Sequence, residues 1–132
     1  MKKVFLSFTS IIKQEGQEHK TKIFVPGVLS ELSDGNQLVF NDTSDNYIVK
    51  TRINYSENHV YISRETNPPT RMTMMKDQYI PMIYPTQYGE LEMQTFLTFL
   101  VVRPNGVNFK YKLIYQESVL GEYEIKIDYK EG

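Results

Sequence analysis

The feature that most constrains this sequence is the alternation of apolar and polar residues along its last third. The alternation runs over 90–103, resumes over 107–115 after the turn Pro104-Asn105-Gly106, and returns over 122–129. A period of two is typical of β-strands that bury one face, and an Asn-Gly pair between two such runs favours a hairpin. The sequence therefore predicts three antiparallel strands, with a hairpin over 90–103 and 107–116 as the most stable part of the fold.

Turn residues extend this pattern along the rest of the chain. They occur at Gly16, Pro26-Gly27, Asp34-Gly35-Asn36, Ser44-Asp45-Asn46, Ser56-Glu57-Asn58, Pro68-Pro69 and Asp77. The runs between them are β-branched and aromatic, and only 28–33 has a helix-like pattern. About eight to ten strands joined by short connections predict an all-β fold, a single antiparallel up-and-down β-barrel in one domain over 1–132.

Composition excludes several classes of partner. The 132 residues include 15 basic and 16 acidic side chains, so no strong field attracts nucleic acid or an anionic membrane. The apolar run over 4–12 is broken by Ser7, Thr9 and Ser10 and is shorter than the roughly 20 residues that span a bilayer. The absence of cysteine suits a reducing compartment. We expect a cytoplasmic protein, and the sequence leaves its oligomeric state open.

Catalytic motifs are absent from the sequence. His19 and His59 lack the spacing of a metal pair, and there is no Gly-x-Ser-x-Gly or phosphate-binding loop. Glu90 and Glu92 lie about 7 Å apart along one strand, but on its polar face, where we expect them to be solvated. The sequence predicts no enzyme, no cofactor and no metal.

Arg64 is the most informative single residue. It shares a strand face with Val60 and Ile62, which predicts that it points toward the barrel interior. An arginine in that position needs a partner, because an unpaired buried charge costs several kcal/mol. The partner is either within the chain, a carboxylate or solvent at the strand end, or it is an anionic ligand.

Tyrosines follow the same inward phase. They are Tyr47, Tyr55, Tyr111, Tyr115, Tyr123 and Tyr129. Near strand ends such rings can pack while their hydroxyls reach solvent. Alternatively, Tyr111 and Tyr115 line a cavity together with Arg64, Thr51 and Thr95. A partly filled barrel is the favoured interpretation.

The segment 84–89, Tyr-Pro-Thr-Gln-Tyr-Gly, marks a change in backbone direction. Pro85 cannot donate to a ladder, which predicts an edge, a bulge or a corner before the long strand. In the alternative, Tyr84 and Tyr88 cap a ligand entrance. The candidate ligand-binding residues are therefore Arg64, Tyr84, Thr86, Tyr88, Tyr111 and Tyr115.

Several of these pieces together resemble a known family. Arg64, the run 70–74 (Thr-Arg-Met-Thr-Met), the Thr-x-Tyr-Gly element at 86–89 and the ending 127–131 are similar to domain-of-unknown-function family 1934, also called YwiB-like. The resemblance spans nearly the whole chain and implies a calycin-like, lipocalin-like closed barrel in the bacterial cytosol. It implies no activity. The chain departs from the family pattern at Thr66, where glycine is expected, and at 40–42, which reads Phe-Asn-Asp.

Two hypotheses for function remain. In the first, the barrel binds a small anionic or amphipathic molecule near Arg64, which requires interior space. In the second, the barrel is filled and the chain is an interaction module that binds a protein partner through rim loops or an exposed strand.

Overall fold

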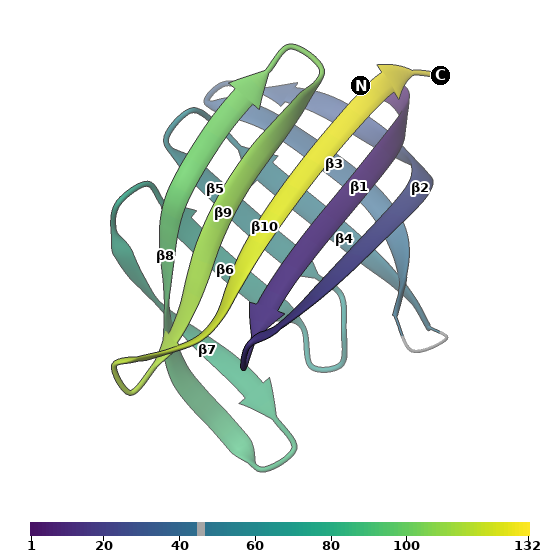
Figure 1. Cartoon of the computed structure of the whole chain (residues 1–132). Helices are drawn as coiled ribbons and strands as arrows, with labels where there is room; N and C mark the ends of the chain where they lie inside the picture. Colours follow the sequence, from purple (N-terminus) through teal and green to yellow (C-terminus); the bar gives the residue numbers. More distant parts are fainter. Residues whose placement is uncertain (45–46) are drawn as a thin grey trace.

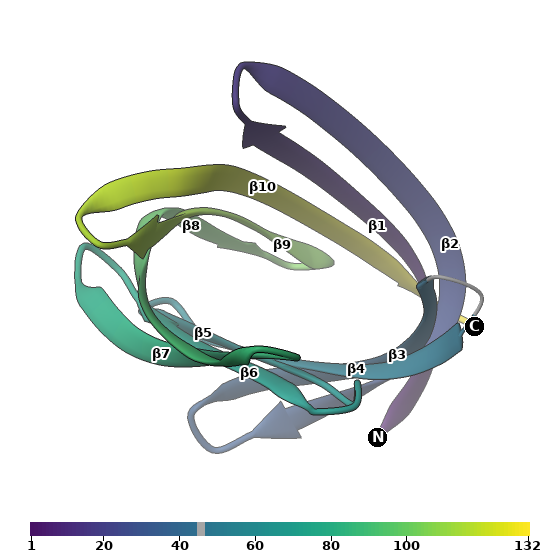
Figure 2. The same cartoon turned by 90° about the horizontal axis from the view of Figure 1, so that it is seen from below.

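The computed structural model describes residues 1–44 and 47–132, which form one antiparallel sheet of ten strands. The strands are β1 (Lys2–Gln14), β2 (Gln17–Leu32), β3 (Gly35–Ser44), β4 (Tyr47–Tyr55), β5 (His59–Arg64), β6 (Thr70–Met75), β7 (Tyr79–Thr86), β8 (Gly89–Arg103), β9 (Gly106–Tyr115) and β10 (Ser118–Glu131). The sheet curls into a nearly closed barrel, as Figures 1 and 2 show. The predicted all-β up-and-down barrel is thus confirmed.

The sheet order explains how the barrel closes. Sequential strands are neighbours, and β1 pairs with β10, which leaves β6 and β7 as the two ends of the order β6-β5-β4-β3-β2-β1-β10-β9-β8-β7. The gap is closed by contacts of β6 and the following residues with β8: the Asp77 N–H donates to the Leu97 carbonyl at 3.0 Å, and the Thr95 hydroxyl donates to the Thr73 carbonyl at 2.9 Å. The barrel is therefore closed by a few bonds instead of a full ladder.

The predicted turn at Pro26-Gly27 is wrong, because both residues lie inside β2. The ladder between β2 and β3 runs from Leu32 to Gly27 and stops there. Alternate residues of β2 bond β3, so the next bond would need an N–H from Pro26, which proline lacks. Pro26 ends a ladder, and the strand itself continues. The helix-like stretch 28–33 is likewise part of β2 up to Leu32.

The other sequence predictions about the strands have mixed outcomes. The long hairpin predicted over 90–103 and 107–116 is observed as β8 and β9. The inward phase predicted for Tyr47 is not matched by burial: its side chain is 74% exposed, because the first residues of β4 lie beyond the packed part of the barrel. Asp45 and Asn46 of one predicted turn lie outside the described residues.

The core is concentrated toward one end of the barrel. We call it the closed end; it carries both termini and the turns at 33–34, 56–58 and 104–105 (Figure 1). Its inward side chains are fully buried, among them Leu38, Ile53, Val60, Val107 and Ile127. The opposite end, which carries the turns at 15–16, 65–69, 87–88 and 116–117, we call the open end.

Candidate functional site at the open end

Inward-facing side chains near the open end are only partly buried. Phe8, Val25, Ile62, Met72 and Leu113 pack against the core but retain exposed surface. Phe8 lies against the buried ring of Phe40, with ring centroids 5.6 Å apart. The inner wall at this end is therefore apolar and partly accessible to solvent.

Arg64 is held on this wall by a carboxylate of the chain. Its Nη2 donates to Asp42 Oδ1 at 2.9 Å, and the Thr51 hydroxyl donates to Asp42 Oδ2 at 3.0 Å. Thr51 and Arg64 are register partners on β4 and β5, which places both on the same face of the sheet. The internal partner that the sequence argument required is thus Asp42, and both its oxygens are occupied.

The contact leaves part of the guanidinium without a protein partner. Within the described residues, Arg64 makes no hydrogen bond through Nε or Nη1, and its side chain is 35% exposed. A guanidinium has five N–H donors, and Asp42 engages one. Arg64 therefore retains donors for a further acceptor.

Two tyrosines on β9 and β10 add further polar groups near Arg64. The rings of Tyr111 and Tyr123 are 4.9 Å apart, and Gln14 Nε2 donates to the Tyr123 hydroxyl at 2.9 Å. Burial raises the pKa of Tyr111 above its ordinary range, and the positive charge of Arg64 lies close enough to oppose that rise. Burial also raises the pKa of Tyr123, to which Tyr84 adds a smaller contribution. We call Arg64, Asp42, Thr51, Tyr111 and Tyr123 the mouth cluster.

The structure brings some of the six predicted ligand-binding residues together and places the others elsewhere. Arg64 and Tyr111 belong to the mouth cluster, and Tyr84 lies near it. Tyr115 is half-buried at the last position of β9. Thr86 is engaged within its own turn, since its hydroxyl donates to the Gly89 carbonyl at 2.7 Å and accepts from the Tyr88 N–H at 3.1 Å. Tyr88 is 91% exposed at the tip of the β7–β8 hairpin. Thr86 and Tyr88 thus lie at a turn, apart from the mouth cluster.

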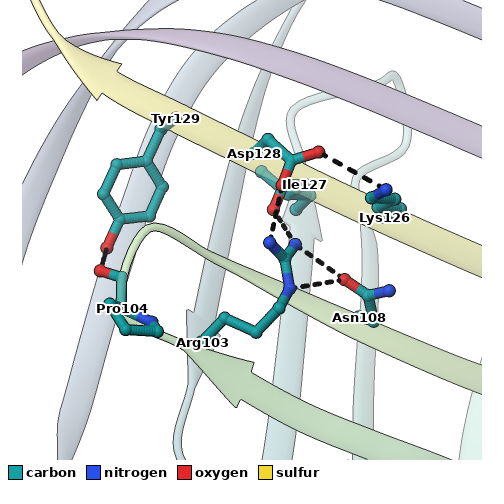
Figure 3. A network of polar contacts seen from close by, with 7 residues as sticks. All are labelled: Arg103, Pro104, Asn108, Lys126, Ile127, Asp128 and Tyr129. Carbon is teal, nitrogen blue, oxygen red and sulfur yellow. Dashed lines mark hydrogen bonds and ion pairs between the residues drawn. The ribbon is translucent and has the colours of Figure 1, made fainter.

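A second arginine, Arg103 at the closed end, differs from Arg64 because all three of its guanidinium nitrogens donate hydrogen bonds. Figure 3 shows Arg103 using three nitrogens: Nε and Nη2 donate to Asn108 Oδ1, Nη1 donates to Asp128 Oδ1 at 2.7 Å, and Nη2 also donates to the Ile127 carbonyl. Nearby, the Tyr129 hydroxyl donates to the Pro104 carbonyl at 3.2 Å. These bonds tie the β8–β9 turn to β10, so Arg103 is a structural residue.

Sequence reasoning missed three residues of the polar networks at the two ends of the barrel. Asp42 was visible only as the acid in 40–42, and nothing in the pattern placed it opposite Arg64, since that contact depends on the register of three strands. Gln14 lies just before the turn residue Gly16, and it reaches Tyr123 because β1 runs beside β10. Arg103 follows an alternating run and precedes a turn, which gives no hint of its network.

The arrangement at the open end suits noncovalent recognition. In the parts of the chain that the structure describes, no group of three or more His, Cys, Asp or Glu side chains is placed to hold a metal. The described residues also contain no helix long and apolar enough to cross a membrane. Donors at one place beside an apolar wall are the usual composition of a site for a small amphipathic molecule.

Comparison with known proteins places the chain in a family. The model of the domain of unknown function DUF1934 matches residues 6–127. The chain belongs to the DUF1934 family. The resemblance seen in the sequence is therefore confirmed.

A solved structure supports the fold of this DUF1934 chain. The crystal structure of the ywiB protein from Bacillus subtilis matches with a TM-score of 0.75 at 17% identity, covering 99% of this chain and 92% of that one. At this identity the likeness shows a shared fold. The comparison with curated proteins gave no match.

Proposed function

We propose that this DUF1934 chain is a cytoplasmic binding protein that holds a small amphipathic anion at the open end of its barrel. The observation that carries the proposal is the unsaturated guanidinium of Arg64, which lies on a partly exposed inner wall with two hydroxyl-bearing neighbours, Thr51 and Tyr111. The ligand's anionic head would accept hydrogen bonds from Nε and Nη1 of Arg64. An acceptor bound there gains charge-assisted bonds, which are about twice as strong as neutral ones.

The apolar wall supplies the second half of the site. Phe8, Ile62, Met72 and Leu113 are partly buried hydrophobic residues packed on the core. A hydrocarbon tail lying against them removes apolar surface from water, at about 25 cal/mol per Å². The closed end, whose side chains fill the barrel, limits how deep the tail can enter.

Asp42 moderates this affinity. Its carboxylate neutralises Arg64 in the free protein and repels an anion that approaches the same guanidinium. In Asp42→Asn the one amide oxygen can still accept from Arg64, and the amide NH2 can donate to the Thr51 hydroxyl, so the negative charge is removed without stranding either neighbour. We therefore expect Asp42→Asn to bind the anion more tightly, the opposite of what a structural ion pair alone predicts.

Binding alone is proposed, without catalysis. The raised pKa of Tyr111 keeps its phenol protonated near neutral pH, and Asp42 is engaged by Arg64 and Thr51. An enzyme site needs a nucleophile, an acid or a base with a pKa suited to proton transfer. The mouth cluster holds groups suited to orienting a ligand.

The test is calorimetric titration of the protein with dodecanoate, with dodecanol as the uncharged analogue. Arg64→Leu should weaken dodecanoate binding by at least about tenfold, the effect of one lost charge-assisted contact, while dodecanol binding changes little. Arg52→Leu is the matched control, because Arg52 is exposed on the neighbouring strand and pairs in register with Ser63. Equal effects of the two variants, or no binding by the parent protein, would overturn the proposal.

The second candidate, an interaction module with a filled barrel, has one observation in its favour. Phe5 and Phe24 are 54% and 73% exposed and line a groove of about 500 Å³ on the outer surface with Pro26 and Lys130. This candidate predicts that Phe5→Ser with Phe24→Ser abolishes capture of a protein partner and that Arg64→Leu leaves capture unchanged. The two candidates are thus separated by which face of the barrel carries the sensitive residues.

A further inference from the structure

Two segments near the open end have one strand edge without a neighbour among the described residues. The ladder between β2 and β3 begins at Gly27, so over 17–26 β2 pairs with no described residue on that side. The ladder between β8 and β9 begins at Gln94, so β8 has no partner on that side over 89–93. Both segments lie in hairpins that extend beyond the packed barrel (Figures 1 and 2).

The alternation of hydrogen bonding along each strand shows which residues point their backbone N–H and C=O groups to these edges. The β1–β2 loop has two residues, Glu15 and Gly16, both with positive φ, so Gln14 and Gln17 form its closing hydrogen-bonded pair. Because bonding alternates along an antiparallel strand, Glu18, Lys20, Lys22 and Phe24 direct their N–H and C=O groups to the open edge.

The same alternation, counted from the closing pair of the hairpin loop, applies to β8. Thr86 and Gly89 close the two-residue loop between β7 and β8, so Gly89, Leu91 and Met93 bond β7. The backbone groups of Glu90 and Glu92 therefore face the open edge of β8.

The side chains on the two edges carry opposite charges. Lys20 and Lys22 are exposed on β2, and Glu90 and Glu92 are exposed on β8. None of the four forms an ion pair with another described residue. In each segment the charged residues are two apart, which is the spacing of neighbours on one face of a strand.

We propose that the open edge of β2 binds the open edge of β8 from a second copy of this chain. The antiparallel register that places Lys20 opposite Glu92 also places Lys22 opposite Glu90, with the bonding groups of both strands in phase. The same register brings Tyr88, 91% exposed at the hairpin tip, toward Phe24, 73% exposed. Opposite charges directly across a strand pair stabilise it, and aromatic pairs do so as well.

Charge also excludes the competing pairings. Two β2 edges aligned on their lysines would repel, as would two β8 edges aligned on their glutamates, and such repulsion selects the mixed pair. The outer edge of β7 carries Pro81 and Pro85, which cannot donate to an added strand. The β2 edge has no proline from Gln17 to Val25.

Each copy offers both edges, so the contact can form twice. If the two contacts are related by a two-fold axis, they close a dimer; if not, they propagate as an open chain. In both cases the mass in solution exceeds that of one chain and falls at high salt, because exposed charges are screened within about 10 Å at 0.1 M salt.

The experiment is light scattering on size-exclusion fractions over a wide concentration range, with two charge-reversal variants. K20E/K22E and E90K/E92K should each remain monomeric, with dissociation constants raised at least about tenfold. An equimolar mixture of the two should associate again, because every contact in the mixture then joins glutamates to lysines. K3E/K50E is the control with the same charge change on exposed lysines outside both edges, and it should associate as the parent does.

The outcomes are decisive in both directions. A parent protein that stays monomeric at every concentration overturns the proposal, as does a mixture of the two variants that does not associate. Association that K20E/K22E and K3E/K50E weaken equally assigns the interface to another surface. Circular dichroism of each variant confirms that loss of association is not loss of fold.

Discussion

The two ends of the barrel each hold an arginine, and the two arginines differ in how fully they are bonded. Arg103 at the closed end uses Nε, Nη1 and Nη2 and ties three segments together. Arg64 at the open end uses Nη2 alone, on Asp42. Arg103 lies with Asn108 and Asp128 on the outer face of the closed end, whereas Arg64 lies on the inner wall of the open end, which keeps exposed surface. The difference teaches that the fold depends on one end of the barrel and leaves the other end available for binding.

The largest expected effect tests whether stability is concentrated at the closed end. Ile127 is fully buried there, and Ile12 is half-buried near the open end. Ile127→Ala should cost about 2–5 kcal/mol of unfolding free energy, whereas Ile12→Ala should cost about 1 kcal/mol, because the second site is already partly hydrated. Urea denaturation measures both, and equal losses would contradict the comparison.

Replacing each of the two arginines tests the comparison between the closed end and the open end more narrowly. Arg103→Leu removes bonds to Asn108, Asp128 and the Ile127 carbonyl, and we expect a loss of about 2–3 kcal/mol. Arg64→Leu removes one bond and leaves Asp42 with Thr51, so we expect about 1–2 kcal/mol. The same denaturation experiment ranks them, and a larger loss for Arg64→Leu would mean that the open end holds the fold.

The high-pH limb of stability probes buried phenols at both ends. Burial raises the pKa of Tyr55, toward the closed end, and of Tyr111 in the mouth cluster. The unfolded chain loses these protons near pH 10, while the folded chain retains them. The contribution of these two phenols to stability is therefore constant below about pH 10 and falls as pH rises above it. Tyr55→Phe and Tyr111→Phe should each flatten that fall in denaturation series, and an unchanged slope would show that the phenol titrates normally.

The smallest effect concerns a single hydroxyl. The Tyr55 hydroxyl is buried beside the side chains of Asn36 and Tyr129 but makes no hydrogen bond of ordinary length to a described residue, so Tyr55→Phe near neutral pH should be neutral or stabilise by up to about 1 kcal/mol. Tyr129→Phe is the matched control, because it removes a bond to Pro104 and should destabilise by about 0.5–1 kcal/mol. Equal destabilisation by both variants would mean that the Tyr55 hydroxyl is hydrogen-bonded in solution.

Local patterns predicted most of the fold, because alternation and turn chemistry act over a few residues. The β8–β9 hairpin and the inward phase of Arg64 followed from those patterns directly. Pro26 was misread because a proline at a ladder's end and a proline in a turn look alike without the neighbouring strand. The Asp42 contact depends on the register of β3, β4 and β5, which only the assembled sheet fixes. For the same reason the open edges of β2 and β8 were invisible in the sequence.

The most direct test of the account is to map dodecanoate on the folded protein by its effect on backbone amide resonances. Binding at the open end should shift amides around Arg64, Thr51, Tyr111 and Tyr123 and leave those around Arg103 and Asn108 unchanged, and Arg64→Leu should reduce the shifts at the same dodecanoate concentration. Shifts confined to the outer groove at Phe5 and Phe24, or shifts around Arg103, would contradict the assignment of the open end as the binding site.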